Sequence, residues 1–158
     1  MLTFALLFTL DALIAATLLR LRKIMHPVVL AYGYLTAVIL FDQTYTVVNY
    51  NLGLIDSPPD MLAFVGVRLY AFIVYPFLFL WLSACLFRHI PPLRQAAIVL
   101  IYIGLATLYD YVLVWAGYVE LIRWTLALSI IRHIVFIAIL IPAMLGFRRW
   151  LESRESAL

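Results

Sequence analysis

The chain alternates long apolar runs with short polar links. Five runs stand out, at about residues 2–19, 27–49, 61–87, 96–116 and 124–147. As a helix rising about 1.5 Å per residue, each run can cross roughly 30 Å of hydrocarbon. Membrane strands would need segments of about ten residues with alternating polarity, which these runs lack. The pattern predicts an all-α integral membrane protein: a bundle of five transmembrane helices that forms a single transmembrane domain over residues 1–158.

The links carry residues that begin helices. Pro91 and Pro92 precede the fourth run, where a proline at the start of a helix sacrifices no hydrogen bond. Before the third run, Ser57 and Asp60 flank two prolines. This order predicts Ser57 as the helix cap, a proline at the first helical position and an acid in the first turn.

Composition agrees with the membrane assignment and narrows the function. Hydrophobic residues make up 67% of the 158 residues and charged residues only 12%, and this leaves no room for a soluble catalytic domain. Cys85 is the single cysteine in the sequence, so no internal disulfide or cysteine metal cluster can form. The common catalytic and phosphate-binding motifs are also missing from the sequence. We therefore expect no catalytic residue, no metal, no cofactor and no nucleic-acid partner.

Basic residues predict the orientation. Eight lie in the first link, the third link and the tail, and one lies in the fourth link. They are Arg20, Arg22, Lys23, Arg88, Arg94, Arg148, Arg149 and Arg154 against Arg123. Basic links stay in the cytoplasm, so the N-terminus should face out and the C-terminus in. The first run lacks a basic leader and contains Asp11, which favours a retained helix over a cleaved signal peptide.

Ionisable residues also fall inside the runs. They are Asp11, Asp42, Arg68, Asp110 and Arg132, and His133 adjoins the last. An Asp or Arg near the centre of a span costs about 2.5 to 3.5 kcal/mol, so five unpaired groups facing lipid would cost on the order of 15 kcal/mol. These side chains should face the bundle interior and pair with one another.

Depth along antiparallel helices predicts the partners. Asp42 and Arg68 each lie seven residues from the outer ends of their runs, about 10 Å deep at 1.5 Å per residue. Asp110 and Arg132 share a similar level in the last two runs. We therefore predict a polar cluster of these four residues with His133 in the outer half. Such pairs can serve as structural pins, or they can form a ligand or ion site.

Asp11 has no cation at its own depth. It lies beside the small residues Ala12, Ala15 and Ala16, so it is either protonated in place or turned toward the core. Three aspartates against two arginines leave one surplus negative charge within the spans, which a protonated His133 or Asp11 would cancel. This makes Asp11 a candidate for proton coupling.

Two pairs of runs resemble each other. The first run of one pair reads Tyr34-x7-Asp42-x6-Asn49-Tyr50, and the first run of the other pair reads Tyr102-x7-Asp110-x6-Gly117-Tyr118. Each return run carries an arginine and then a proline, Arg68 with Pro76 and Arg132 with Pro142. The similarity predicts a parallel repeat of one helical hairpin, formed by helices 2–3 and 4–5, with coincidence as the alternative.

Several scattered positions also carry a resemblance. They are His26-Pro27 at the start of a run, Asp42, Tyr75-Pro76, Asp110, and Gly117-Tyr118 before Trp124. In this layout the chain resembles a family of small multi-pass membrane proteins of Bacillus, Clostridium and relatives that has no assigned activity. The chain departs from that family at Asp110, where glutamate is expected. The resemblance implies a bacterial cytoplasmic (plasma) membrane and assigns no functional residues.

These observations favour a non-enzymatic scaffold, sensor or accessory subunit in the bacterial plasma membrane, which binds a membrane protein partner or lipid. The alternative is a small proton-coupled transporter or carrier, expected as a homo-oligomer, that uses Asp11 or the Asp/Arg cluster. A lipid-modifying enzyme ranks third.

Overall fold

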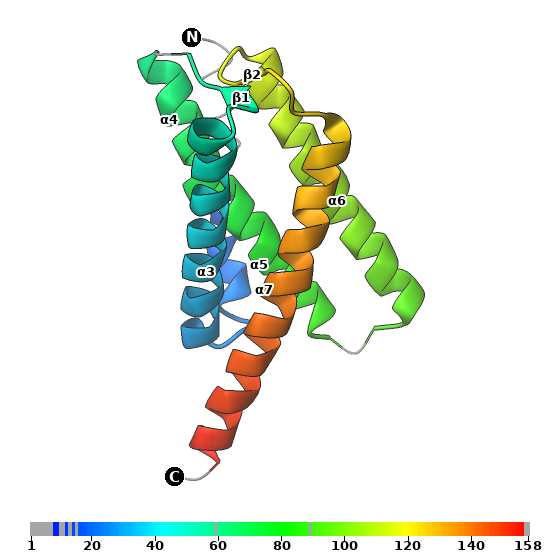
Figure 1. Cartoon of the computed structure of the whole chain (residues 1–158). Coiled ribbons are helices and arrows are strands. Elements are labelled where there is room, and N and C mark those ends of the chain that lie inside the picture. The colour runs from blue at the N-terminus through cyan, green and yellow to red at the C-terminus, as the bar shows by residue number, and fades with distance from the viewer. Residues whose placement is uncertain are drawn as a thin grey trace.

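The computed structural model describes residues 8, 9, 12, 14, 16–58, 60–88 and 90–156 (Figure 1). Most of the expected first span, with Asp11, lies outside these residues. Within them, four helical segments are long and apolar enough to cross a membrane: Pro27–Asn51, Met61–Leu86, Pro92–Trp115 and Leu126–Glu155. This is the architecture of an all-α membrane protein. The expected fifth span stays a prediction.

The first two of these segments each combine α-helix with a short π-helix. The first contains α3 (Pro27–Thr46) and η1 (Val47–Asn51). The second contains α4 (Met61–Leu69), η2 (Tyr70–Val74) and α5 (Tyr75–Leu86), and the remaining two are α6 (Pro92–Trp115) and α7 (Leu126–Glu155). A short helix, α2 (Leu18–Leu21), and two strands, β1 (Ile55–Asp56) and β2 (Glu120–Leu121), complete the described elements.

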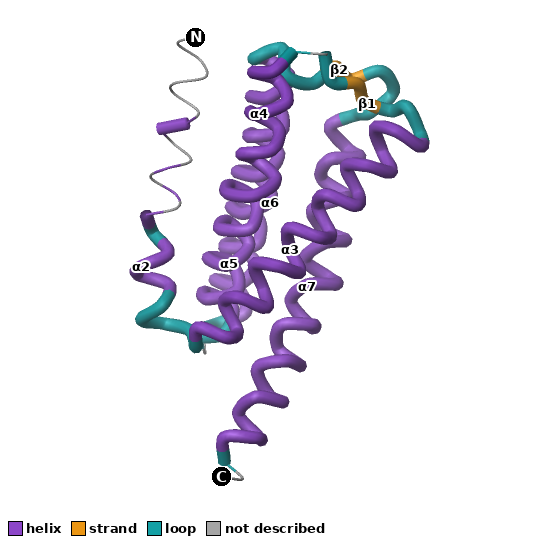
Figure 2. Tube along the Cα trace, turned by 90° about the vertical axis from the view of Figure 1, so that its left-hand side faces the viewer, coloured by secondary structure: helices purple, strands orange, loops and turns teal. Residues whose placement is uncertain are grey.

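The four segments form a ring. Helix α3 packs against α5 and α7, and α6 packs against the same two helices from the opposite side. Figure 2 shows α2 at the edge of this bundle, where the indole nitrogen of Trp81 on α5 donates a 2.7 Å hydrogen bond to Oγ1 of Thr17. The interior of the ring is thus built from two helical hairpins, α3 with α4–α5 and α6 with α7.

The two hairpins are joined at one end by a very small sheet that the sequence pattern did not predict. Strands β1 and β2 are antiparallel, with Ile55 opposite Leu121. Just before β1, the carbonyl of Leu54 accepts hydrogen bonds from the backbone N–H groups of three successive residues, 122 to 124, at 3.0 to 3.1 Å. These contacts cover the end of the bundle where both hairpin links lie (Figure 1).

Helix starts follow the sequence prediction in part. Helix α6 begins at Pro92, as expected. Helix α4, however, is capped by Asp60, which accepts a 3.4 Å hydrogen bond from the N–H of Ala63. The prediction that Ser57 caps this helix is wrong, because its hydroxyl is hydrogen bonded to the hydroxyl of Tyr45. The cap therefore lies three residues later, and the serine ties the link to α3.

Proline explains the widened turn in the second segment. Pro76 has no N–H to donate to the carbonyl of Phe72, and its ring disfavours a regular helix there. The hydroxyl of Tyr34 on α3 donates a 2.9 Å hydrogen bond to that free carbonyl. The chain also forms the π-helix η2, in which the N–H of Tyr75 bonds to the carbonyl of Tyr70. Both Tyr70 and Tyr75 are thereby buried in the centre of the bundle.

Aromatic rings fill the core between the four segments. The rings of Tyr70 and Tyr109 are stacked with centroids 4.7 Å apart, and Phe41 packs edge-on against Tyr70 at 5.0 Å. Outward-facing positions are also apolar; among them Leu100, Leu108 and Ile139 are each about half exposed or more. Apolar residues on both the inside and the outside are typical of a helix bundle in lipid.

Gly66 on α4 provides a close approach between a helix and a link. A Cβ atom at this position would lie 2.6 Å from Cδ2 of Tyr118, whose ring packs on the glycine. Tyr118 is itself buried. A larger residue at position 66 must therefore displace a buried ring.

We expect Gly66→Ala to lower the thermal unfolding midpoint in detergent, because overpacking typically costs about 1 to 3 kcal/mol. Gly104→Ala on α6 is the matched control, since no atom lies within 4 Å of a Cβ there. Its expected effect is a gain of up to about 1 kcal/mol from helix propensity. Equal shifts in the two variants would contradict the packing described for Tyr118.

Candidate functional site

A cavity of about 280 Å³ lies at the end of the bundle that β1 and β2 cover. We call it the strand-end cavity. All four helical segments and both strands contribute to its walls, most of which are aliphatic or aromatic. The lining residues that carry a carboxylate, guanidinium or hydroxyl group are Tyr45, Tyr70, Thr107, Asp110, Tyr111, Ser129 and Arg132. A mainly apolar pocket with a few convergent polar groups is the usual form of a small-molecule site.

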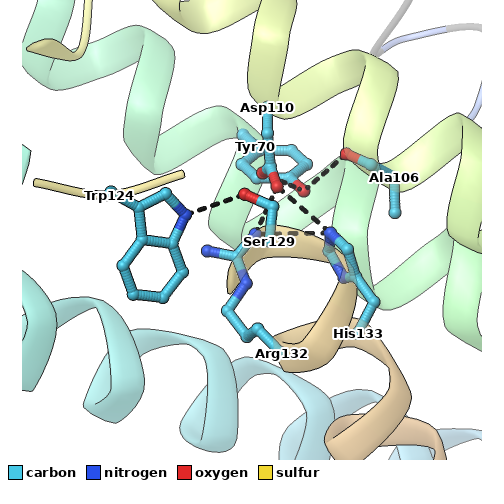
Figure 3. A network of polar contacts seen from close by, with 7 residues as sticks. All are labelled: Tyr70, Ala106, Asp110, Trp124, Ser129, Arg132 and His133. Carbon is cyan, nitrogen blue, oxygen red and sulfur yellow. Dashed lines mark hydrogen bonds and ion pairs between the residues drawn. The ribbon is translucent and has the colours of Figure 1, made fainter. Parts of the chain in front are cut away.

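An ion pair forms the polar wall of this cavity (Figure 3). Nη2 of Arg132 on α7 donates to Oδ2 of Asp110 on α6 at 2.5 Å. The hydroxyl of Tyr70 donates to the other carboxylate oxygen, Oδ1, at 2.9 Å. Side-chain exposure is 17% for Asp110 and 11% for Arg132. Because both residues line the strand-end cavity, this remaining exposure is available to a bound molecule.

His133 completes the network from the next position on α7. Its ring is fully buried, and Nε2 lies 3.1 Å from Oδ2 of Asp110 and 3.3 Å from Nη2 of Arg132. One ring nitrogen cannot donate to the carboxylate and accept from the guanidinium at once. Because Arg132 already balances the charge of Asp110, a neutral His133 that donates through Nε2 fits the site best.

Two rings hold the guanidinium of Arg132 in place. Its Cζ lies 5.3 Å from the ring centroid of Phe41 and 5.8 Å from that of Trp124. The indole nitrogen of Trp124 in turn donates a 2.8 Å hydrogen bond to the hydroxyl of Ser129 (Figure 3). Cation–π contacts of this type are strongest where water is excluded. Arg132 is therefore oriented by its surroundings before any ligand binds.

Several buried polar atoms in and around the site have no hydrogen-bond partner among the described residues. Among the residues that line the strand-end cavity, these are Nε of Arg132 and Oγ1 of Thr107. Nδ1 of His133, which does not line the cavity, is also buried without a partner among the described residues. Buried polar groups are rarely left unsatisfied, and each exception calls for an explanation such as a bound molecule.

The second ion pair is separate from this network. Arg68 on α4 pairs with Asp42 on α3, and neither residue lines the strand-end cavity. Their side chains are 36% and 30% exposed, and Arg68 also lies over the ring of Phe64 at 5.3 Å. Successive helical residues point about 100° apart. Phe41 therefore faces the core and Arg132, while Asp42 faces α4.

The five predicted cluster residues thus form two groups in place of one. Asp110, Arg132 and His133 meet at the strand-end cavity, and Asp42 and Arg68 form the more exposed pair. The proton-coupling candidate Asp11 lies outside the described residues. In the part of the chain that the structure describes, no group of three or more His, Cys, Asp or Glu residues is placed to hold a metal ion.

Tyr70 and Trp124 are functional-site residues that the sequence prediction missed. Tyr70 enters the network because the π-helix η2 precedes Pro76, and no simple spacing rule indicates such a turn. Trp124 stands at the start of the fifth apolar run, a position typical of a tryptophan at the membrane interface. It precedes α7 and lies five residues before Ser129, a spacing that does not share a helix face, so no sequence signal links it to this site.

Comparisons with protein-family models, with curated proteins and with solved structures found no match to this chain. The site must therefore be interpreted from its own geometry.

We expect Asp110→Asn to destabilise the protein far more than Asp42→Asn does. The first change leaves the buried Arg132 without its counter-charge, which typically costs about 3 to 5 kcal/mol. The second leaves Arg68 without its counter-charge, but Arg68 is 36% exposed near the end of its span, and its long side chain can carry the charge toward the interface at a smaller cost. Thermal unfolding of both variants in the same detergent measures the difference.

The double variant in which Asp110→Leu is combined with Arg132→Met is the control for this comparison. Replacing both buried charges by apolar side chains is often neutral, so stability should recover relative to Asp110→Asn. If Asp42→Asn were the more damaging change, the buried pair would not be the main electrostatic constraint.

Proposed function

We propose that the protein is a non-enzymatic component of the bacterial plasma membrane, a sensor or accessory subunit, that binds a lipid or another small amphiphile in the strand-end cavity. The observation that carries this proposal is the cavity itself. It combines mostly apolar walls with an oriented Asp110–Arg132 pair and two buried polar atoms that lack partners in the described part of the chain. A purely structural ion pair would need no such space beside it.

The volume supports a ligand of modest size. Engineered cavities of about 150 Å³ lined by apolar groups bind benzene, and pockets for drug-sized ligands start at about 300 Å³. At about 280 Å³, the strand-end cavity lies close to the lower limit of the second range. It can take one or two rings, or the polar head and first carbons of a chain, but not a whole phospholipid.

The topology that goes with this proposal has five spans, with the N-terminus outside and the C-terminus in the cytoplasm. The α2–α3 link, the α5–α6 link and the end of α7 lie at the end of the bundle opposite the strands (Figure 2). With the adjoining ends of α2 and α6, these segments hold eight basic residues, against Arg123 alone in the two links at the strand end. The strand-end cavity then lies in the outer half of the bilayer.

A parallel repeat of the two hairpins belongs to the same proposal. Each hairpin link supplies one strand to the antiparallel pair, and the ring of helices maps onto itself when α3 is exchanged with α6 and α5 with α7. Both relations support a two-fold axis along the membrane normal. In this arrangement the Asp42–Arg68 and Asp110–Arg132 pairs are counterparts, of which only the second borders the cavity.

Native mass spectrometry tests the proposal. Delipidated protein is incubated with a bacterial total lipid extract, and we expect about one retained adduct per chain. Val114→Trp places a large ring in the cavity wall and should remove the adduct. Val99→Trp is the matched control, because Val99 is also partly buried on α6 but does not line the cavity.

Equal adduct levels in the two variants, or no adduct in the wild-type protein, would contradict the proposal. Circular dichroism and the unfolding midpoint of each variant show whether the bundle remains folded. A Val114→Phe variant fills less space and serves if the tryptophan prevents folding.

A proton-coupled carrier is the second candidate function. The observation that favours it is the contact between the fully buried His133 and Asp110, since buried chains of titratable groups are typical of proton pathways. Proteoliposomes with an internal pH dye and an imposed pH gradient separate the two functions. Under the binding proposal, we expect no proton uptake above that of empty liposomes; uptake that Asp110→Asn abolishes would favour the carrier.

A further inference from the structure

We infer that the strand-end cavity selects an uncharged ligand whose polar group is a hydrogen-bond acceptor, such as the carbonyl of a quinone or of a neutral glyceride. This inference rests on the proposed binding function and specifies its ligand class. It follows from the balance of donors, acceptors and charges around the cavity.

The free polar groups of Arg132, Thr107 and Ser129 can all donate a hydrogen bond, and the guanidinium of Arg132 can only donate. Of the five N–H groups of Arg132, the hydrogen bond to Asp110 uses one on Nη2, and Nε is buried without a partner among the described residues. The hydroxyl of Thr107 is unpartnered in the same way, whereas the hydroxyl of Ser129 accepts from Trp124 and keeps its own hydrogen for donation. A ligand that offers oxygen lone pairs can satisfy these groups.

The acceptor side of the wall is already occupied. Oδ1 of Asp110 accepts from Tyr70, and Oδ2 is contacted by both Arg132 and His133. A carboxylate has about four lone-pair sites, so little capacity remains for a ligand that donates. A protonated amine, which has no lone pair to offer, would compete with these bonds and leave the donors of Arg132 and Thr107 unpaired.

Charge excludes ions of either sign. Asp110 and Arg132 neutralise each other, so an additional charge in this pocket would have no counter-ion from the wall. Burying an unpaired charge is costly, whereas a neutral carbonyl gains charge-assisted hydrogen bonds without that cost. The site therefore differs from a carboxylate or phosphate site, where an arginine without an acidic partner would be expected.

The mouth of the cavity matches an amphiphile that arrives from the bilayer. Three lining residues, Tyr111, Leu121 and Leu126, have large aromatic or aliphatic side chains and are exposed by 62%, 42% and 58%. They belong to α6, β2 and the first turn of α7. An apolar body can lie against these side chains while its carbonyl reaches Arg132 and Thr107.

A hydroxyl deletion tests the donor assignment. Thr107→Val removes the unpartnered hydroxyl at nearly constant volume, so the empty protein should keep or raise its unfolding midpoint while ligand affinity falls about fivefold. Thr36→Val is the matched control, because its hydroxyl bonds to the carbonyl of Tyr32 at 2.7 Å, away from the cavity. Unchanged affinity in Thr107→Val would overturn the assignment of this hydroxyl to the ligand.

Four probes with similar tails test the ligand class: a short-chain naphthoquinone, dioctanoylglycerol, decanoate and decylamine. In native mass spectrometry, the two neutral probes should displace the lipid adduct and bind saturably. Preference for one of them shows whether the natural ligand is a quinone or a glyceride. Decanoate and decylamine should bind at least tenfold more weakly. Equal or tighter binding of either ion would overturn the inference.

The failure of this inference is distinct from failure of the binding function. If the lipid adduct is present but neither neutral probe displaces it, the ligand class is wrong and the cavity remains a binding site. If no adduct is retained at all, the proposed function fails first.

Discussion

The structure depends on neutralising charge inside a medium that cannot solvate it. Asp110 and Arg132 come from different helices, and each would be costly in hydrocarbon without the other. Their pairing fixes the relative depth and rotation of α6 and α7, and Tyr70 extends the constraint to the neighbouring hairpin. Three of the four segments are thereby set around one carboxylate, and the strand-end cavity lies where they meet.

Much of this arrangement follows from counting along the sequence. Seven-residue distances from the run ends placed Asp42 opposite Arg68, and the same measure placed Asp110 opposite Arg132; these are the pairs that the structure contains. Depth is predictable because the helical rise is constant. The rotation of each helix about its axis is less predictable than its depth. For this reason the sequence did not show that Phe41 would separate the two ion pairs.

The features that counting missed arise from irregular backbone. The π-helix η2 brings Tyr70 to Asp110, and it depends on the local response to Pro76 and on Tyr34, which is 38 residues distant from the carbonyl that it contacts. The shift of the α4 cap from Ser57 to Asp60 likewise depends on a tertiary contact, because Tyr45 engages the serine. Local sequence signals do not contain such long-range partners.

The joined strands have a mechanical consequence. Leu54 and residues 122 to 124 connect the two hairpin links through main-chain groups alone, so substitution of their side chains leaves the connection in place. Cleavage of the chain, in contrast, would not leave this connection in place. A single proteolytic cut within either link would allow the two hairpins to separate at this end while every spanning helix stayed whole. The strand-end cavity would then lose its cover.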